Sequence, residues 1–128
     1  MTAREKIERL TNSWYGYNLV IGVISLLWGG IGIFSIVWTA LSLAFTFTVT
    51  YIIGRKLLNR SSLTRSILLV ISTVASLLLT VGLVFRVLNF ELSFAFAMQT
   101  AFAVTSLSMH VKSLRVLTDK SVKSYFVA

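Results

Sequence analysis

The side chains that most often perform chemistry are scarce in this sequence. It contains one histidine, His110, and no cysteine among 128 residues. Nucleophilic catalysis needs a base and an orienting group beside the nucleophile, and acid–base catalysis needs a tuned carboxyl or imidazole. A catalytic metal needs about three protein ligands. The four acidic residues all lie outside the long apolar stretches, so we expect no enzyme, no metal site and no cofactor; they are Glu5, Glu8, Glu91 and Asp119.

Small hydroxyl side chains recur every three or four residues within the apolar stretches. This spacing puts them on one face of a helix. In lipid such faces let helices approach closely and hydrogen-bond to one another, although the same face could line a polar permeation path. The glutamine among them is expected to hydrogen-bond across a helix interface or between subunits. The residues predicted to pack helices or line a pore are Thr39, Ser42, Thr46, Thr50, Ser76, Thr80, Gln99 and Ser106.

The overall composition is typical of a membrane protein. Hydrophobic residues make up 56% of the chain and charged residues 12%, whereas soluble domains average about 25% charged residues. A soluble domain of this size cannot bury so much apolar surface, because small domains leave much of their surface exposed. The absence of cysteine also excludes a disulfide scaffold.

A run of 45 residues between Arg9 and Arg55 carries no charge. As one helix it would be about 67 Å long, twice the roughly 30 Å of the hydrocarbon core. The chain must therefore fold back on itself within this run. Gly29, Gly30 and Gly32 mark the turn, because glycine adopts backbone angles that other residues avoid.

Two further charge-free stretches of 20 residues follow, at 66–85 and 92–111, and each is long enough to cross a bilayer once. We predict an all-α, four-span transmembrane helical bundle that forms a single domain over residues 1–128. Thr2 and Glu5 predict a capping box at the first helix. The helical spacing of Lys112, Arg115, Asp119 and Lys123 predicts that the last span continues as a helix beyond the membrane. The predicted spans are about 15–30, 33–53, 66–85 and 92–111, and the tails at 1–13 and 112–128 are predicted to be short amphipathic helices.

The basic residues fall almost entirely on one side of this bundle. Eleven of the twelve lysines and arginines lie in the two tails and the loop between the second and third spans. The positive-inside rule then predicts cytoplasmic termini, and we expect a bacterial inner membrane. The basic segments carry no nucleic-acid-binding motif, so anionic lipid headgroups, rather than nucleic acid, are the expected partners. The expected lipid contacts are Arg55, Lys56, Arg60, Arg65, Lys112 and Arg115.

These observations favour a non-enzymatic, multi-pass membrane protein that acts as a subunit of a homo-oligomer or of a larger membrane complex. An oligomeric channel or pore is the first alternative, and its ring of basic residues would favour anions. A lipid- or amphiphile-binding membrane protein is the second alternative.

Overall fold

The structure, a computed structural model that describes residues 2–30 and 32–127, is all α-helical. The described part of the chain is 89% helical, which confirms the all-α part of the predicted fold class. Each of the four long helices overlaps one of the four predicted segments. The described residues form five helices: α1 (Ala3–Gly29), α2 (Ile33–Leu58), α3 (Ser62–Leu88), α4 (Phe94–Leu117) and α5 (Lys120–Val127).

Side-chain caps determine where three of the helices begin. The Thr2 hydroxyl accepts a hydrogen bond from the Glu5 amide at 3.2 Å, and the Glu5 carboxylate accepts one from the Thr2 amide at 3.1 Å. This reciprocal pair is the predicted capping box. The Ser61 and Ser93 hydroxyls cap α3 and α4, and each accepts a hydrogen bond from the amide three residues later. Each such cap stabilises its helix by about 1 kcal/mol.

Glycines connect α1 to α2 and let the two helices pack closely. Gly30 has a φ of 88°, which residues with a side chain rarely adopt, and Gly32 precedes the first turn of α2. The predicted fold-back of the charge-free run is therefore confirmed. Farther from the turn, a Cβ added at Gly22 of α1 would lie only 2.6 Å from Leu43 Cδ2 of α2. The missing side chain thus allows the close approach of α1 and α2.

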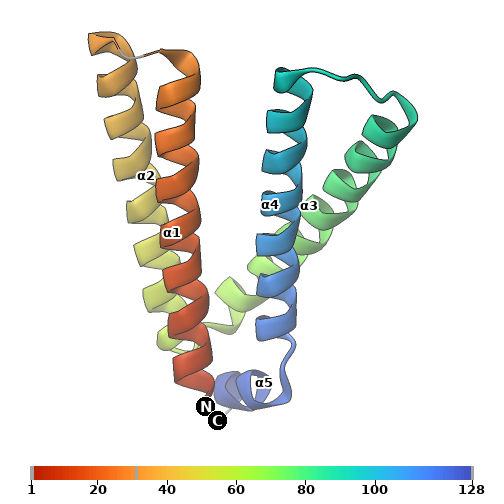
Figure 1. Ribbon diagram of the computed structural model, residues 1–128. Helices are drawn as coiled ribbons and strands as arrows, with labels where there is room; N and C mark the ends of the chain where they lie inside the picture. The colour runs from red at the N-terminus through yellow and green to blue at the C-terminus, as the bar shows by residue number, and fades with distance from the viewer. Residues whose placement is uncertain (1, 31, 128) are drawn as a thin grey trace.

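The four long helices form two hairpins, α1–α2 and α3–α4, arranged as the arms of a V. The hairpins meet at the end of the molecule where both termini lie, and they diverge toward the opposite end (Figure 1). Helix α5 lies across the base of the V, next to the start of α1. The two arms therefore contact each other along only part of their length.

A small hydrophobic core fills the base of this V. Its buried members come from α1, α2, α4 and α5, so the core joins both hairpins to the C-terminal helix. Val122 and Phe126 are four residues apart and place one face of α5 in this core. Burial of a side chain of that size contributes about 1.5–3 kcal/mol. The buried apolar residues are Ile7, Leu10, Leu57, Leu117, Val122 and Phe126.

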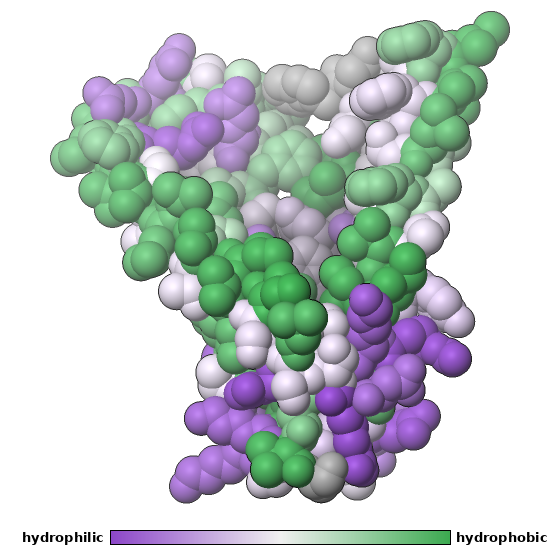
Figure 2. Space-filling model, turned by 180° about the vertical axis from the view of Figure 1, so that it is seen from behind, coloured by the Kyte–Doolittle hydropathy of each residue, from purple (hydrophilic) through white to green (hydrophobic). Residues whose placement is uncertain are grey.

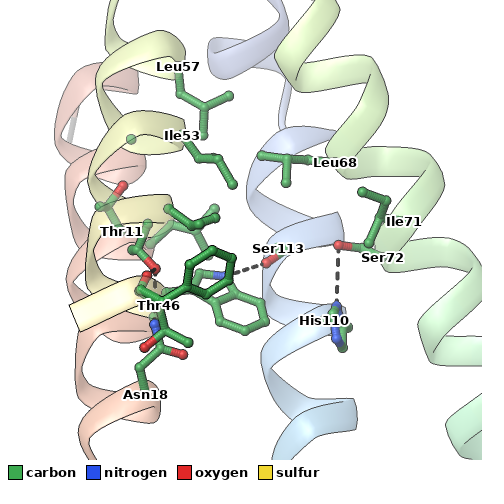
Figure 3. Close-up of a pocket in the computed structure, with 16 residues that line it drawn as sticks. Thr11, Asn18, Thr46, Ile53, Leu57, Leu68, Ile71, Ser72, His110 and Ser113 are labelled. Atoms are coloured by element: carbon green, nitrogen blue, oxygen red, sulfur yellow. Dashed lines mark hydrogen bonds between the residues drawn. The ribbon is translucent and has the colours of Figure 1, made fainter. Parts of the chain in front are cut away.

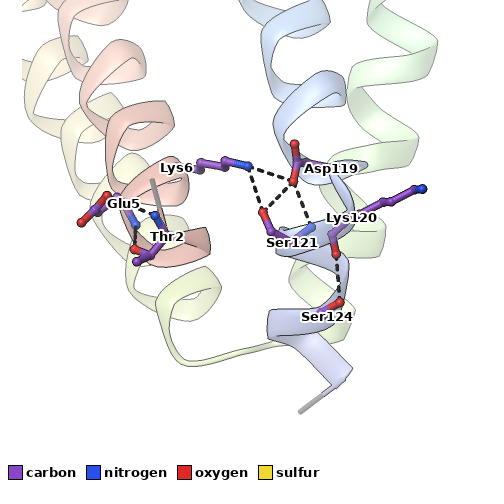
Figure 4. Close-up of polar contacts among 7 residues, drawn as sticks. All are labelled: Thr2, Glu5, Lys6, Asp119, Lys120, Ser121 and Ser124. Carbon is purple, nitrogen blue, oxygen red and sulfur yellow. Dashed lines mark hydrogen bonds and ion pairs between the residues drawn. The ribbon is translucent and has the colours of Figure 1, made fainter.

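The helix that was predicted to continue past the fourth span is interrupted by a bend at positions 118–119. Instead of continuing as one helix, the chain ends α4 at Leu117 and starts α5 at Lys120. Asp119 stabilises the bend, since its carboxylate accepts hydrogen bonds from the Ser121 amide at 2.9 Å and from Lys6 Nζ at 3.0 Å (Figure 4). The bend lets α5 turn its apolar face into the core, which a straight continuation of α4 could not do.

Three helices, α2, α3 and α4, are long and apolar enough to cross a membrane among the described residues. This finding indicates membrane association. Helix α1 is less apolar, because charged and polar residues fill its first half and its strongly apolar stretch covers only positions 19–27. Figure 2 shows apolar surface over both arms and hydrophilic surface gathered at the base, with a second hydrophilic patch near the far end of one arm.

Candidate functional site

A cavity of about 300 Å³ lies between the two hairpins, directly beyond the core at the base (Figure 3). All four long helices contribute to its lining. Leu57 and Leu68 line the part nearest the core, whereas Asn18 and Thr46 lie at the opposite end of the cavity. The cavity is therefore mainly apolar, with a few polar groups placed around it.

Trp14 makes the first polar connection across the cavity. Its indole Nε1 donates a hydrogen bond to Ser113 Oγ at 2.9 Å, and that hydroxyl donates to the Met109 carbonyl at 3.1 Å. The Trp14 ring also packs edge-on against the His110 imidazole, with 5.2 Å between ring centroids. These contacts join α1 to α4, and the Ser113 side chain is only 4% exposed.

His110 makes the second connection, from α4 to α3. Its Nδ1 lies 3.5 Å from the hydroxyl of Ser72, which is only 3% exposed. Ser72 and Ser113 are the two buried polar residues of the described chain, and both face this cavity. A buried hydroxyl costs free energy unless it is hydrogen-bonded, so both serines favour the observed spacing of the helices.

Asn18 and Thr50 form the third polar group, within the first hairpin. Asn18 Nδ2 donates to Thr50 Oγ1 at 2.9 Å, and Thr50 in turn donates to the Thr46 carbonyl at 2.8 Å. The carboxamide oxygen of Asn18 accepts no hydrogen bond from any described residue. A hydrogen-bond acceptor is thus left available at one end of the cavity.

The lining carries no lysine, arginine, aspartate or glutamate. Within residues 2–30 and 32–127, no group of three or more His, Cys, Asp or Glu side chains is placed to hold a metal ion. The arrangement can therefore hold an uncharged molecule by apolar contact and by a few hydrogen bonds.

The predicted polar faces do not all lie in one place. Thr46 and Thr50 line the cavity, and the Ser106 hydroxyl is hydrogen-bonded to the Tyr17 hydroxyl of α1. Ser76 Oγ is buried without a partner in the described chain. Thr39 is half-buried on α2, whereas Ser42, Thr80 and Gln99 are exposed. The structure thus brings together only part of the predicted set.

The predicted lipid-contacting residues also differ in their surroundings. Arg55, Lys56 and Arg115 are exposed. Arg60 lies over the Tyr125 ring at 4.7 Å, and Lys112 donates to the Ser13 hydroxyl at 2.6 Å. Arg65, the remaining predicted residue, is engaged inside the protein. Its Nε and Nη2 atoms donate hydrogen bonds of 2.9 and 2.8 Å to the carbonyl of Leu117, the last residue of α4.

A separate polar cluster lies at the base, outside the helices that are apolar enough to span a membrane (Figure 4). Lys6 Nζ donates to the Ser121 hydroxyl at 2.9 Å as well as to Asp119, and that hydroxyl donates to Asp119 at 2.6 Å. The Ser121 hydroxyl, then Lys6, then the Ser121 amide lower the pKa of Asp119 to about 2. Asp119 therefore remains ionised at any physiological pH and links α5 to α1.

Trp14, Asn18 and Ser113 were not predicted as site residues. Each has a neighbour on the same helical face, Asn18 four residues after Trp14 and Ser113 three residues after His110. That spacing could have placed them on shared faces, but it does not say which faces meet, either within a hairpin or between the two hairpins.

Comparison with family models, with characterised proteins and with solved structures found no match for this chain.

Proposed function

We propose that this chain is a non-enzymatic, multi-pass membrane protein that acts as a subunit of a homo-oligomer or of a larger membrane complex. The observation that carries the proposal is the exposure of polar side chains on otherwise apolar helices. Ser42 and Gln99 are exposed on α2 and α4, which are two of the three helices apolar enough to span a membrane. Lipid tails offer such groups no hydrogen-bond partner, whereas a neighbouring helix does.

Gln99 is the clearest case of an exposed polar side chain on an apolar helix. Its Oε1 accepts a hydrogen bond from Arg86 Nη2 at 3.2 Å, while its side-chain NH₂ group donates to no described residue. Hydrogen bonds between helices in lipid contribute about 0.6–2 kcal/mol each. A second subunit that accepts from this amide would therefore add measurably to association.

The proposed topology is four spans with both termini in the cytoplasm of a bacterium, within its inner membrane. Helix α1 runs antiparallel to α2 (Figure 1), and only three residues separate its end at Gly29 from the start of α2 at Ile33. Since their far ends are connected by residues 30–32 alone, a crossing by α2 requires a crossing by α1. The concentration of eleven basic residues on the side of the termini supports the orientation.

Association is tested by native mass spectrometry of the protein extracted with its surrounding lipid. We expect a defined assembly larger than one chain, and Gln99→Leu is expected to weaken it roughly three- to thirty-fold. Thr105→Val is the matched control, because Thr105 is an exposed residue of the same helix whose hydroxyl already bonds the Ala101 carbonyl. A wild-type chain that is monomeric under these conditions would contradict the proposal.

Topology is tested with single cysteines, since the natural chain has none. Asn89→Cys in the α3–α4 connection should react with a membrane-impermeant maleimide on intact cells, which requires that this loop be accessible from outside. Asn59→Cys in the α2–α3 connection should react only after the membrane is opened. Equal labelling of both positions on sealed cells would refute the proposed orientation.

The channel alternative receives less support from the contacts. Thr46 and Thr50, which belong to the predicted stripe, donate to carbonyls of their own helix and so do not need water. Toward the termini, the space between the hairpins is filled by the apolar core. Ion flux through liposomes at a known density of verified oligomer would favour the channel over a purely associative role.

A further inference from the structure

The cavity between the hairpins has the properties of a ligand site. Its volume of about 300 Å³ is about twice that of a cavity of about 150 Å³ that binds benzene, and it falls at the lower end of the range for small-molecule sites. Its walls are also fixed in position, because three separate hydrogen-bonded groups join the four helices that line it. We propose that this cavity binds an uncharged, mainly apolar molecule that carries a hydroxyl group, of the kind represented by a medium-chain alcohol.

The absence of charge in the wall determines the first property of the ligand. None of the lining residues is a lysine, arginine, aspartate or glutamate. An ionised carboxylate or amine that left water for this space would lose its hydration without gaining an opposite charge. The site therefore selects a neutral molecule over the corresponding acid or amine.

The unused hydrogen-bonding atoms determine the second property. Asn18 already donates to Thr50 through Nδ2, so its free atom is the acceptor Oδ1. The His110 ring faces Ser72 through Nδ1 and has its other nitrogen left without a partner in the described chain. A ligand that donates a hydrogen bond satisfies the Asn18 oxygen, and a hydroxyl group does so without bringing a charge. A plain alkane leaves that oxygen unsatisfied.

The openings of the cavity determine how the ligand arrives. Three of its lining residues, Phe45 and Val49 on α2 and Ile71 on α3, are themselves exposed, Phe45 to 71%. They lie on helices that are apolar enough to span a membrane, on the side where α2 faces α3. Toward the termini the cavity is closed by the buried leucines of the core. The ligand therefore enters from the bilayer between α2 and α3, which requires a lipid-soluble molecule.

Trp14 provides a built-in reporter, because its indole lines the cavity. With Trp28→Phe and Trp38→Phe, Trp14 is the only indole in the chain. We would titrate this protein in detergent micelles with 10-bromodecan-1-ol, whose bromine quenches indole fluorescence. The matched probes are 1-bromodecane, which lacks the hydroxyl, and 10-bromodecanoate, which carries a charge. Concentrations are expressed per mole of detergent, so that partition into micelles is common to all three.

The expected result is saturable quenching by the bromoalcohol with an apparent affinity roughly five-fold higher than that of the bromoalkane, as one additional hydrogen bond gives. The bromoacid should be weaker than the bromoalcohol at a pH where it is ionised. Asn18→Leu keeps the approximate shape of the side chain and should reduce binding of the bromoalcohol to that of the bromoalkane. The Thr50 hydroxyl keeps its own acceptor in this variant, the Thr46 carbonyl.

A matched pair of substitutions on α3 separates the cavity from the general surface. Ile71→Phe enlarges a residue of the cavity opening, whereas Val70→Phe enlarges its exposed neighbour that does not line the cavity. We expect Ile71→Phe to reduce saturable quenching at least five-fold and Val70→Phe to leave it unchanged. Equal quenching by alcohol and alkane, or an equal effect of the two phenylalanine variants, would overturn the proposal in favour of simple partition into the micelle. Tighter binding of the bromoacid would overturn the selection for a neutral ligand.

Discussion

The docking of α5 onto the base of the V leads to a quantitative prediction. Phe126 is 8% exposed and contacts the core, and the Arg65 guanidinium lies 5.8 Å from the centre of its ring. Removing a buried phenylalanine from a rigid core costs about 3–5 kcal/mol. Helix α5 has only eight residues and can leave the core, so Phe126→Ala loses only the burial of the ring, about 2 kcal/mol. The equilibrium constant for undocking should therefore rise roughly 30-fold.

Hydrogen exchange measured by mass spectrometry in lipid nanodiscs tests this magnitude. An isolated helix of this length is unstable in water, so undocked α5 unfolds and its amides exchange. Protection of residues 120–127 should fall roughly 30-fold in Phe126→Ala, while protection within α2 and α3 should stay the same. Val127→Ala is the control, because Val127 is 87% exposed and belongs to the same helix. Unchanged protection of α5 in Phe126→Ala, or an equal loss in Val127→Ala, would show that the core does not hold α5.

Three further predictions concern the base and the first hairpin. The folded-state pKa of Asp119 is lowered to about 2 from 3.8, so the stabilising effect of this carboxylate on α5 is present above about pH 4 and is lost as the pH falls toward 2. Hydrogen exchange of α5 measured between pH 5 and 2 should show this loss, and Asp119→Asn should abolish the pH dependence. Arg65→Gln should lower the melting temperature, because it removes a guanidinium with two hydrogen bonds to the Leu117 carbonyl; the same temperature as wild type would show these bonds to be dispensable. Gly22→Leu should destabilise the α1–α2 hairpin by about 1–3 kcal/mol through overpacking, whereas Gly82→Leu, where a Cβ meets open space, should not; thermal unfolding compares the two.

Features determined by neighbouring residues could be predicted from the sequence. The capping box needs only Thr2 and Glu5 at their spacing of three, and the turn between α1 and α2 needs only the glycines around position 30. The all-α class follows from charge-free runs of bilayer length with no proline to interrupt them. Each of these depends on contacts within one helix or one turn.

Features that depend on distant contacts could not be predicted in this way. The bend before α5 is stabilised in part by the Lys6 ammonium, 113 residues away in sequence from Asp119. The cavity requires Trp14 to meet Ser113 and His110 to meet Ser72, across separations of 99 and 38 residues. Helical spacing assigns each of these side chains to a face, but it does not say which faces meet.

The divergence of the two hairpins has a consequence for the surrounding bilayer. If the arms cross as proposed, the protein is narrow where they are joined near the termini and wide at the opposite end (Figure 1). The same four helices cross at either level, so the cross-section of the protein itself does not grow toward the wide end. Acyl chains of the leaflet at that end would therefore fill the space between the arms and lie between the apolar surfaces of the two hairpins (Figure 2).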